Sequence, residues 1–188
     1  PEGDRWAVMR LGELIAKVRR AWDDFEFHAI FQAVNNFCSV DLSAVYLDIL
    51  KDRLYTFRAD SPVRRGSQTV LFDITVALAK LLAPILSFTA EEIWRMLPDV
   101  VRKEGTSVHL TPFPENLAIW RDEQLAARWE QLLAYRSLVQ GELEARRREK
   151  VIGSSLEAHV HIEAGPDAYE FLISYAEELS ALFIVSRV

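Results

Sequence analysis

Apolar side chains recur every three or four residues through the first part of the chain, with charged side chains between them. The first run covers residues 4–22, and similar runs follow over 27–37 and 41–55. This spacing places the apolar positions on one face of an α-helix, so it predicts three successive amphipathic helices. Ser39 and Asp41 are candidate caps at the start of the third helix, because short polar side chains can bind free backbone N–H groups there.

A fourth helix is expected after Ser61 and Pro62, because serine is a favoured N-cap and proline is tolerated at the first helical position. A broad apolar face follows over 70–82, and Pro84 should end or kink the helix. The segment 89–92, Thr-Ala-Glu-Glu, has the capping-box pattern that opens another short helix. Wide apolar faces on successive helices joined by short connections predict an antiparallel helical bundle.

Three prolines and a glycine interrupt residues 98–121, and we interpret this segment as a connector with a short β-like stretch at 107–110. A long helix is expected to follow over 122–149, because its apolar residues keep the helical spacing. Its inward positions are expected to be Leu125, Trp129, Leu132, Leu133, Val139 and Leu143.

Apolar and polar residues alternate over 156–162, a helix is expected to start after Gly165, and the run 182–188 again favours a strand. This order predicts a β-α-β tail in which a right-handed crossover joins two parallel strands. Two strands make a poor sheet by themselves, so either 107–110 joins them or the sheet continues outside this sequence.

The expected fold class is therefore mainly α. An antiparallel helical bundle is expected over 1–97, a connector over 98–121, and a long helix with a small, truncated α/β module over 122–188. Both ends look cut, because the chain begins Pro-Glu-Gly and stops in an apolar run.

Half of the 188 residues are apolar, which is the composition of a globular protein. No apolar run approaches the ~20 residues that span a membrane, and no signal-peptide pattern is present, so we expect a cytoplasmic protein. The single cysteine, Cys38, excludes an internal disulfide. Its helical spacing from Val34 favours a buried structural thiol.

Sequence motifs for chemistry are absent. The chain has no phosphate-loop, dinucleotide-binding or serine-hydrolase signature. His159 and His161 could form half of a metal site, but no third ligand is evident nearby, so two solvent-facing histidines are the favoured interpretation. We expect no catalytic residue and no metal or other cofactor in this chain.

Positive charge is collected in one segment of an otherwise acidic chain. Residues 46–69 hold five basic and three acidic side chains, a local charge of +2, while the whole chain carries −6. Lys51 and Tyr55 share a helical face with Asp48, so Lys51 is a candidate phosphate contact and Tyr55 a candidate for stacking. Arg53 falls nearer the apolar stripe and is expected to pair with an aspartate or a neighbouring helix.

Arg58, Arg64 and Arg65 lie in or beside the turn before the fourth helix, where arginines and helix-start N–H groups can meet phosphates together. A second candidate patch ends the long helix and comprises Arg146, Arg147, Arg148 and Lys150. The alternative for that patch is a solvated helix terminus, whose cations suit the negative end of the helix dipole.

Several motifs together resemble a known family. Asp-Arg-Trp at 4–6 and PILSFTAEEIW at 84–94 are similar to the anticodon-binding region of class I aminoacyl-tRNA synthetases. YLDILKDRLYT at 46–56, SVHLTPFPE at 107–115 and KVIGSSLEAHV at 150–160 resemble the bacterial isoleucyl-tRNA synthetase family in particular. The resemblance covers nearly the whole chain.

The resemblance implies a bundle that holds the anticodon stem and loop of an isoleucine-specific tRNA. The parent enzyme would ligate isoleucine to that tRNA with ATP and magnesium, and would carry zinc in a further C-terminal module. The family's nucleotide-binding motifs, editing domain and zinc-binding cysteines are absent from these residues. The chain is therefore expected to be catalytically inactive, with tRNA and the remaining catalytic and editing domains as its partners.

The sequence also allows a function of a different class. The chain could be a structural or protein-interaction bundle without an RNA role. Clustering of arginine and lysine on one face near an exposed tyrosine would favour RNA, and even scattering of the charges would favour the scaffold.

Overall fold

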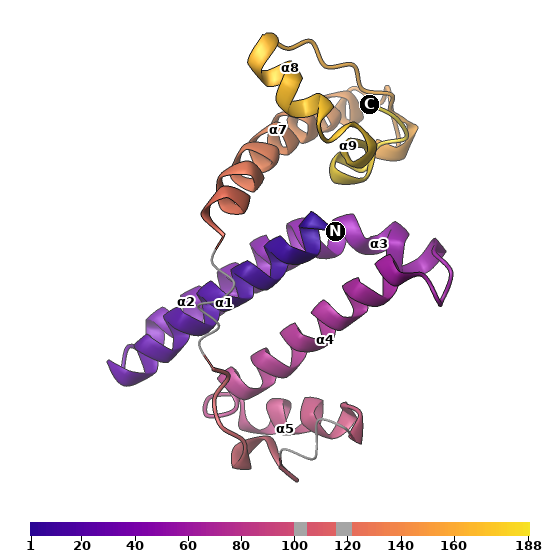
Figure 1. The fold of residues 1–188 in the computed structure, drawn as a ribbon. Helices are drawn as coiled ribbons and strands as arrows, with labels where there is room; N and C mark the ends of the chain where they lie inside the picture. The colour runs from indigo at the N-terminus through magenta and orange to yellow at the C-terminus, as the bar shows by residue number, and fades with distance from the viewer. Residues whose placement is uncertain (100–104, 116–121) are drawn as a thin grey trace.

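The computed structural model describes residues 1–99, 105–115 and 122–188, and these residues are mainly helical. Figure 1 shows two groups of helices: α1 to α5 form the lower group, and α7 to α9 lie above it. In chain order the helices are α1 (Glu2–Asp23), α2 (Phe27–Asn36), the π-helix η1 (Phe37–Tyr46), α3 (Leu47–Thr56), α4 (Pro62–Leu82), α5 (Ser87–Met96), the 3-10 helix η2 (Val108–Leu110), α7 (Glu123–Arg148), the 3-10 helix η4 (Ser155–Glu157), α8 (Pro166–Ile173) and α9 (Ala176–Phe183).

The predicted break between the second and third helices was wrong, because α2, η1 and α3 continue one another with helical backbone angles at both junctions. Ser39 is no cap; its hydroxyl donates to the Asn35 carbonyl at 2.6 Å. Asp41 is buried and pairs with Arg10 of α1 at 3.1 Å. Both side chains are therefore occupied inside the helix, and no free N–H groups remain for them to cap.

Sequence signals located α4 and α5 with different accuracy. Ser61 occupies the N-cap position of α4, although its side chain makes no capping hydrogen bond, and the helix ends at Leu82, two residues before Pro84, as predicted. The existence of α5 is confirmed, but it begins at Ser87, so the expected capping box lies inside the helix. Glu91 instead accepts hydrogen bonds from Ser107 and from the Val108 N–H at 2.7 and 3.1 Å, which holds the connector against α5.

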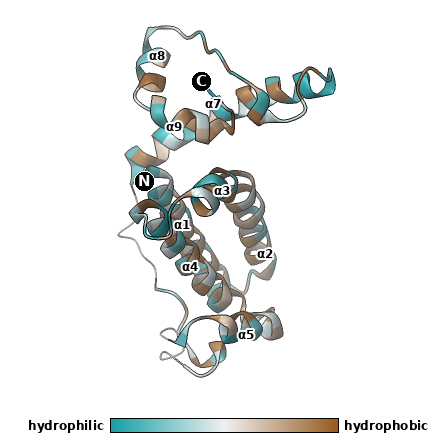
Figure 2. Ribbon diagram, turned by 90° about the vertical axis from the view of Figure 1, so that its right-hand side faces the viewer, coloured by the Kyte–Doolittle hydropathy of each residue, from teal (hydrophilic) through white to brown (hydrophobic). Residues whose placement is uncertain are grey.

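Buried apolar side chains form one large core that joins both groups of helices. Figure 2 shows apolar and polar residues alternating around the bundle helices, as amphipathic helices require. Trp6 of α1 stacks on Trp129 of α7 with the ring centroids 4.9 Å apart. A second, smaller core surrounds Trp94 of α5, whose indole N–H donates to the Gly105 carbonyl at 3.1 Å.

The long helix was predicted correctly. Asp122 is its N-cap and accepts a hydrogen bond from the Leu125 N–H at 2.9 Å. The β-like stretch at 107–110 was wrong, because these residues enter a 3-10 helix that buries Val108 in the smaller core. One turn of helix places this single apolar side chain against α4 and α5. A strand at this position would have no neighbouring strand to pair with in the described part of the chain.

The β-α-β tail was also wrong. Residues 156–162 and 184–188 meet at a single parallel bridge, between His159 and Arg187, rather than as two strands. The run after 182 does not become extended at once, because Leu182 and Phe183 are buried on the last turn of α9. The chain then turns at Ile184, which has a φ of 57°. The alternation of apolar and polar residues therefore correctly indicated a half-buried, extended segment. It did not make a strand, because a strand also needs a hydrogen-bonded neighbour along its length.

Candidate nucleic-acid interface

Lys51 and Tyr55 project from the exposed side of α3. The Lys51 ammonium lies 2.8 Å from Asp48, and its side chain is 69% exposed. Tyr55 is 83% exposed. An exposed ion pair of this kind is weak, so the lysine can exchange its carboxylate for a phosphate at small cost.

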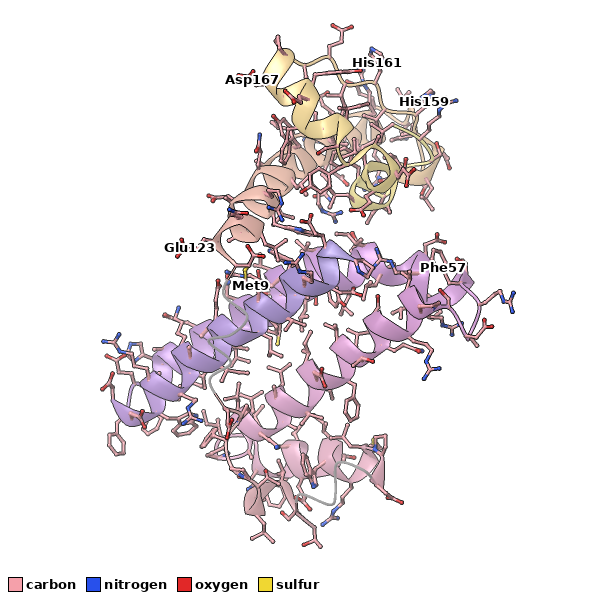
Figure 3. The ribbon with its side chains drawn as sticks, in the orientation of Figure 1. Met9, Phe57, Glu123, His159, His161 and Asp167 are labelled. Atoms are coloured by element: carbon pink, nitrogen blue, oxygen red, sulfur yellow. The ribbon has the colours of Figure 1, made fainter. Side chains whose placement is uncertain are left out.

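The turn between α3 and α4 separates its three arginines into different environments. Arg64 is half-buried and donates to the Phe57 carbonyl at 2.7 Å, so it closes the turn; Figure 3 labels Phe57 there. Arg58 is exposed and pairs with Asp60 at 3.1 Å. Arg65 is exposed, and its guanidinium has no hydrogen bond or ion pair within the described ranges. Arg58 and Arg65 are therefore accessible to a ligand, and Arg64 is held by the turn.

Arg53 has the structural role that its helical position predicted. Its side chain is 19% exposed and lies 3.4 Å from Asp4 of α1 and 3.5 Å from the Ser67 hydroxyl of α4. The partner is on a neighbouring helix, as the prediction allowed. Arg53 therefore belongs to the bundle interior.

Asp4 is the centre of a buried polar cluster that sequence reasoning missed. Its carboxylate accepts from the Tyr46 hydroxyl at 2.9 Å and from the Ser67 hydroxyl at 3.0 Å, and it is only 7% exposed. Burial, with the Asp4 charge adding to it, raises the pKa of Tyr46. The signal was available, because Asp4 lies on the apolar face of α1 one turn before Val8.

Two groups of polar contacts, centred on Arg136 and on Glu2, attach α7–α9 to the bundle in addition to the Trp6–Trp129 stack. Arg136 of α7 is 2% exposed; it donates to Asp48 at 2.8 Å, to the Ala44 carbonyl at 3.0 Å, and to the Leu182 carbonyl. Sequence reasoning missed Arg136, although it is a basic residue at a helical interval after Leu132 and Leu133.

Glu2 forms the second contact. It accepts from Arg128 of α7 at 2.5 Å and from the Tyr175 hydroxyl at 3.0 Å. Burial and Glu2 together raise the pKa of Tyr175, and the hydrogen bond to Glu2 raises the pKa of Arg128. These groups, like Arg136, hold the last helices in place rather than face a ligand.

The basic patch at the end of α7 is exposed and largely engaged with its own helix. Arg146 pairs with Glu149 at 3.0 Å, and Arg147 pairs with Glu144 and donates to the Ser155 hydroxyl at 2.9 Å. The Arg148 Nε donates to the Glu144 carbonyl at 3.4 Å. Lys150 is exposed and has a positive φ of 60°, which ends the helix. These contacts suit both a helix terminus and a surface that a phosphate could approach.

A second exposed aromatic group surrounds the α1–α2 turn. Phe25, Phe27 and Phe31 are 77%, 50% and 70% exposed. Phe27 and Phe31 belong to the apolar run over 27–37, which was predicted to form the apolar face of a bundle helix. Their exposure shows that this run is wider than the face that α1 covers. The Phe25 and Phe27 rings meet edge to face with centroids 6.4 Å apart, and Arg20 on α1 is also exposed. Exposed aromatic rings can stack on unstacked bases.

A groove of about 640 Å³ lies between α1 and α4. Its lining is mostly apolar, and burial raises the pKa of Asp73 on its wall. None of the predicted RNA contacts lines it. The candidate interface therefore lies on exposed helix and turn surfaces outside this groove.

His159 and His161 are exposed on the upper group of helices and point outward in Figure 3. Within residues 1–99, 105–115 and 122–188, no group of three histidine, cysteine or acidic residues could hold a metal ion. Cys38 is half-buried against the core, and burial raises the pKa of its thiol. No helix in these ranges has the length and apolarity to cross a membrane.

The described residues form a helical domain that carries exposed cations and aromatic rings on its surface. Residues 4–162 match the model of the family described as the anticodon-binding domain of tRNA ligase, and the chain belongs to this family.

Curated relatives identify a narrower group. The chain is 48% identical over 187 residues to the isoleucine–tRNA ligase of Moorella thermoacetica and 48% identical over 187 residues to that of Geobacter sulfurreducens. It is 47% identical over 188 residues to the isoleucine–tRNA ligase of Syntrophotalea carbinolica. Each alignment covers 100% of this chain and 20% of the relative, so the chain spans about a fifth of the length of these enzymes.

Proposed function

We propose that this chain is the anticodon-binding part of an isoleucine–tRNA ligase and that it holds the anticodon stem and loop of the isoleucine tRNA. The parent enzyme would ligate isoleucine to this tRNA with ATP and magnesium, with zinc in a separate module. The catalytic and editing domains of the same polypeptide would be the chain's other partners, in the cytoplasm. The chain itself would contribute binding and orientation, and no chemical step.

The proposal assigns a different role to each part of the chain. Residues 1–97 would form the RNA-binding bundle, 98–121 the connector, and 122–188 the module that docks on it. The module adds the second basic patch to the surface.

Phosphates would be bound by Lys51, Arg58 and Arg65, because their side chains are exposed at α3 and the α3–α4 turn. Bases unstacked from the loop would lie on exposed rings, for which Tyr55 and Phe31 are the candidates. The observation that carries the proposal is the exposed Arg65 guanidinium, with Lys51 and Arg58 also exposed on α3 and the α3–α4 turn, in a chain whose net charge is −6.

Binding of tRNA at two salt concentrations tests this proposal. The isoleucine tRNA should bind more tightly than a valine tRNA at both concentrations, with affinity falling steeply as salt rises, because each phosphate contact releases counterions. Equal binding of the two tRNAs would leave only non-specific affinity for polyanions.

One observation favours the scaffold alternative: Arg58, Arg146 and Arg147 already pair with acidic neighbours. A bundle that uses its cations internally would bind neither tRNA at low salt. The same titration therefore separates the two functions.

A further inference from the structure

Asp48 of α3 carries two cations on one carboxylate. Its Oδ1 lies 2.8 Å from the Lys51 ammonium, and its Oδ2 lies 2.8 Å from the Arg136 guanidinium of α7. Lys51 is a candidate phosphate contact, and Arg136 docks the α7–α9 module. We propose that Asp48 is a positioning residue that couples phosphate binding at Lys51 to the docking of α7–α9 through Arg136. This inference rests on the proposed function, because it requires RNA to reach Lys51.

The two ion pairs differ in how firmly they are held. The Lys51 side chain is 69% exposed, so water competes with its bond to Asp48. The Arg136 side chain is 3% exposed, and Asp48 is its one carboxylate partner in the described part of the chain. A buried cation depends strongly on such a partner. A phosphate can therefore draw Lys51 away from Asp48 far more readily than Arg136 can leave it.

Electrostatics gives the direction of the coupling. Without RNA, the buried guanidinium shares the Asp48 charge with Lys51 and is repelled by the lysine, which carries the same sign. A phosphate on Lys51 neutralises that charge and leaves the carboxylate to Arg136. RNA binding therefore stabilises the docked position of α7 and α9, and by linkage a docked module favours RNA at Lys51.

Docking does not depend on Asp48 alone. Glu2 binds Arg128 and Tyr175, and Arg5 pairs with Asp122 at 2.8 Å. Variants at Lys51 should consequently remain folded with the module attached. What they change is the response of the module to RNA.

Hydrogen exchange of the 188-residue chain tests the coupling, read at peptides 132–140 and 179–185, with and without the anticodon stem-loop RNA of an isoleucine tRNA. RNA should slow exchange in these peptides about fivefold, near the lower end of known couplings. At RNA concentrations that saturate each variant, the slowing should disappear in K51M and D48N. Equal slowing in K51M would overturn the proposal while leaving RNA binding intact.

A comparison of variants without RNA tests the shared carboxylate independently. K51M removes the competing cation, so exchange in the same peptides should already be slower than in the wild type. K17M removes an exposed lysine of α1 and should not change it; identical behaviour of K51M and K17M would overturn the shared-carboxylate coupling. If the RNA fails to bind the wild type, the proposed function is wrong, and so is the predicted effect of RNA on docking. The comparison of K51M with the wild type without RNA still decides whether Asp48 links its two cations.

Discussion

The Asp4 carboxylate accepts a 2.9 Å hydrogen bond from the Tyr46 hydroxyl, which joins the start of α1 to the end of η1 inside the bundle. Ser67 of α4 and Arg53 of α3 bind the same carboxylate. One buried acid thus connects four helices, α1, η1, α3 and α4. Its loss leaves a buried hydroxyl and a mostly buried guanidinium without their partner, and such orphaned groups are costly.

D4A should therefore lower the free energy of unfolding by about 3 kcal/mol, in the range found when one partner of a buried ion pair is removed. Urea titration followed by circular dichroism measures this change. D60A is the matched control, because Asp60 is 71% exposed in a surface ion pair, and it should cost less than about 1 kcal/mol. Equal losses in the two variants would contradict a structural role for the Asp4 cluster.

Tyr46 should make the fold sensitive to alkali. Its pKa is raised by burial and by Asp4 above the ordinary value of about 10. Between pH 10 and the raised pKa the folded protein keeps a proton that the unfolded chain loses, so stability is complete below pH 10 and falls as the pH rises. The slope from this group approaches about 1.4 kcal/mol per pH unit.

Y46F should reduce that slope in urea titrations between pH 9 and 11, while lowering stability at pH 7 by about 1.5 kcal/mol through loss of the hydrogen bond to a charged acceptor. Some slope should remain, because the pKa of Tyr175 is also raised. Y55F, at an exposed position, is the control. An unchanged alkaline slope in Y46F would show that its hydroxyl is not held by Asp4.

K51A and R65A should each weaken binding of the isoleucine tRNA, because each removes an exposed cation from the α3–α4 surface. Losing one phosphate contact should reduce the slope of log affinity against log salt by about 0.7 to 0.9. Gel-shift titrations at several salt concentrations measure both quantities. R95A removes an exposed arginine of α5 that pairs with Glu91; if it has the same effect as R65A, the loss reflects net charge and not a contact.

F31A should weaken tRNA binding with little change in the salt slope, because stacking on a base involves no counterion release. The expected loss is about 1 to 3 kcal/mol for one stacked base. L138A removes an apolar side chain of α7 that is also well exposed, 68% against 70% for Phe31, but offers no aromatic face. Equal affinities of F31A and L138A would exclude Phe31 from the interface.

Helical signals in the sequence were sufficient for most of the bundle. The spacing of apolar residues located α1, α4 and α7, and Pro62 and Pro84 marked both ends of α4 because proline acts on the local backbone. Predictions of helix caps failed where a polar side chain had more than one possible hydrogen-bond partner. Ser39 resembled a cap, yet in the structure it binds its own helix.

Within the candidate site, helical phase correctly assigned Arg53 to the interior and placed Lys51 beside Asp48, because both depend on positions three or four residues apart. It could not separate Arg64, which closes the turn, from Arg65, which is exposed. That difference depends on the path of the backbone at Phe57, and a turn's path is not encoded by the spacing of charges.

By itself, the sequence determined the helical class, the family resemblance and the region where accessible cations are concentrated, because periodicity, caps and local motifs act over one or two turns of chain. Only the tertiary structure decided that the tail is not a sheet, that Phe31 is exposed, and that Arg136 reaches across from α7 to Asp48. Each of these depends on which elements cover one another, and that depends on contacts between residues far apart in the chain.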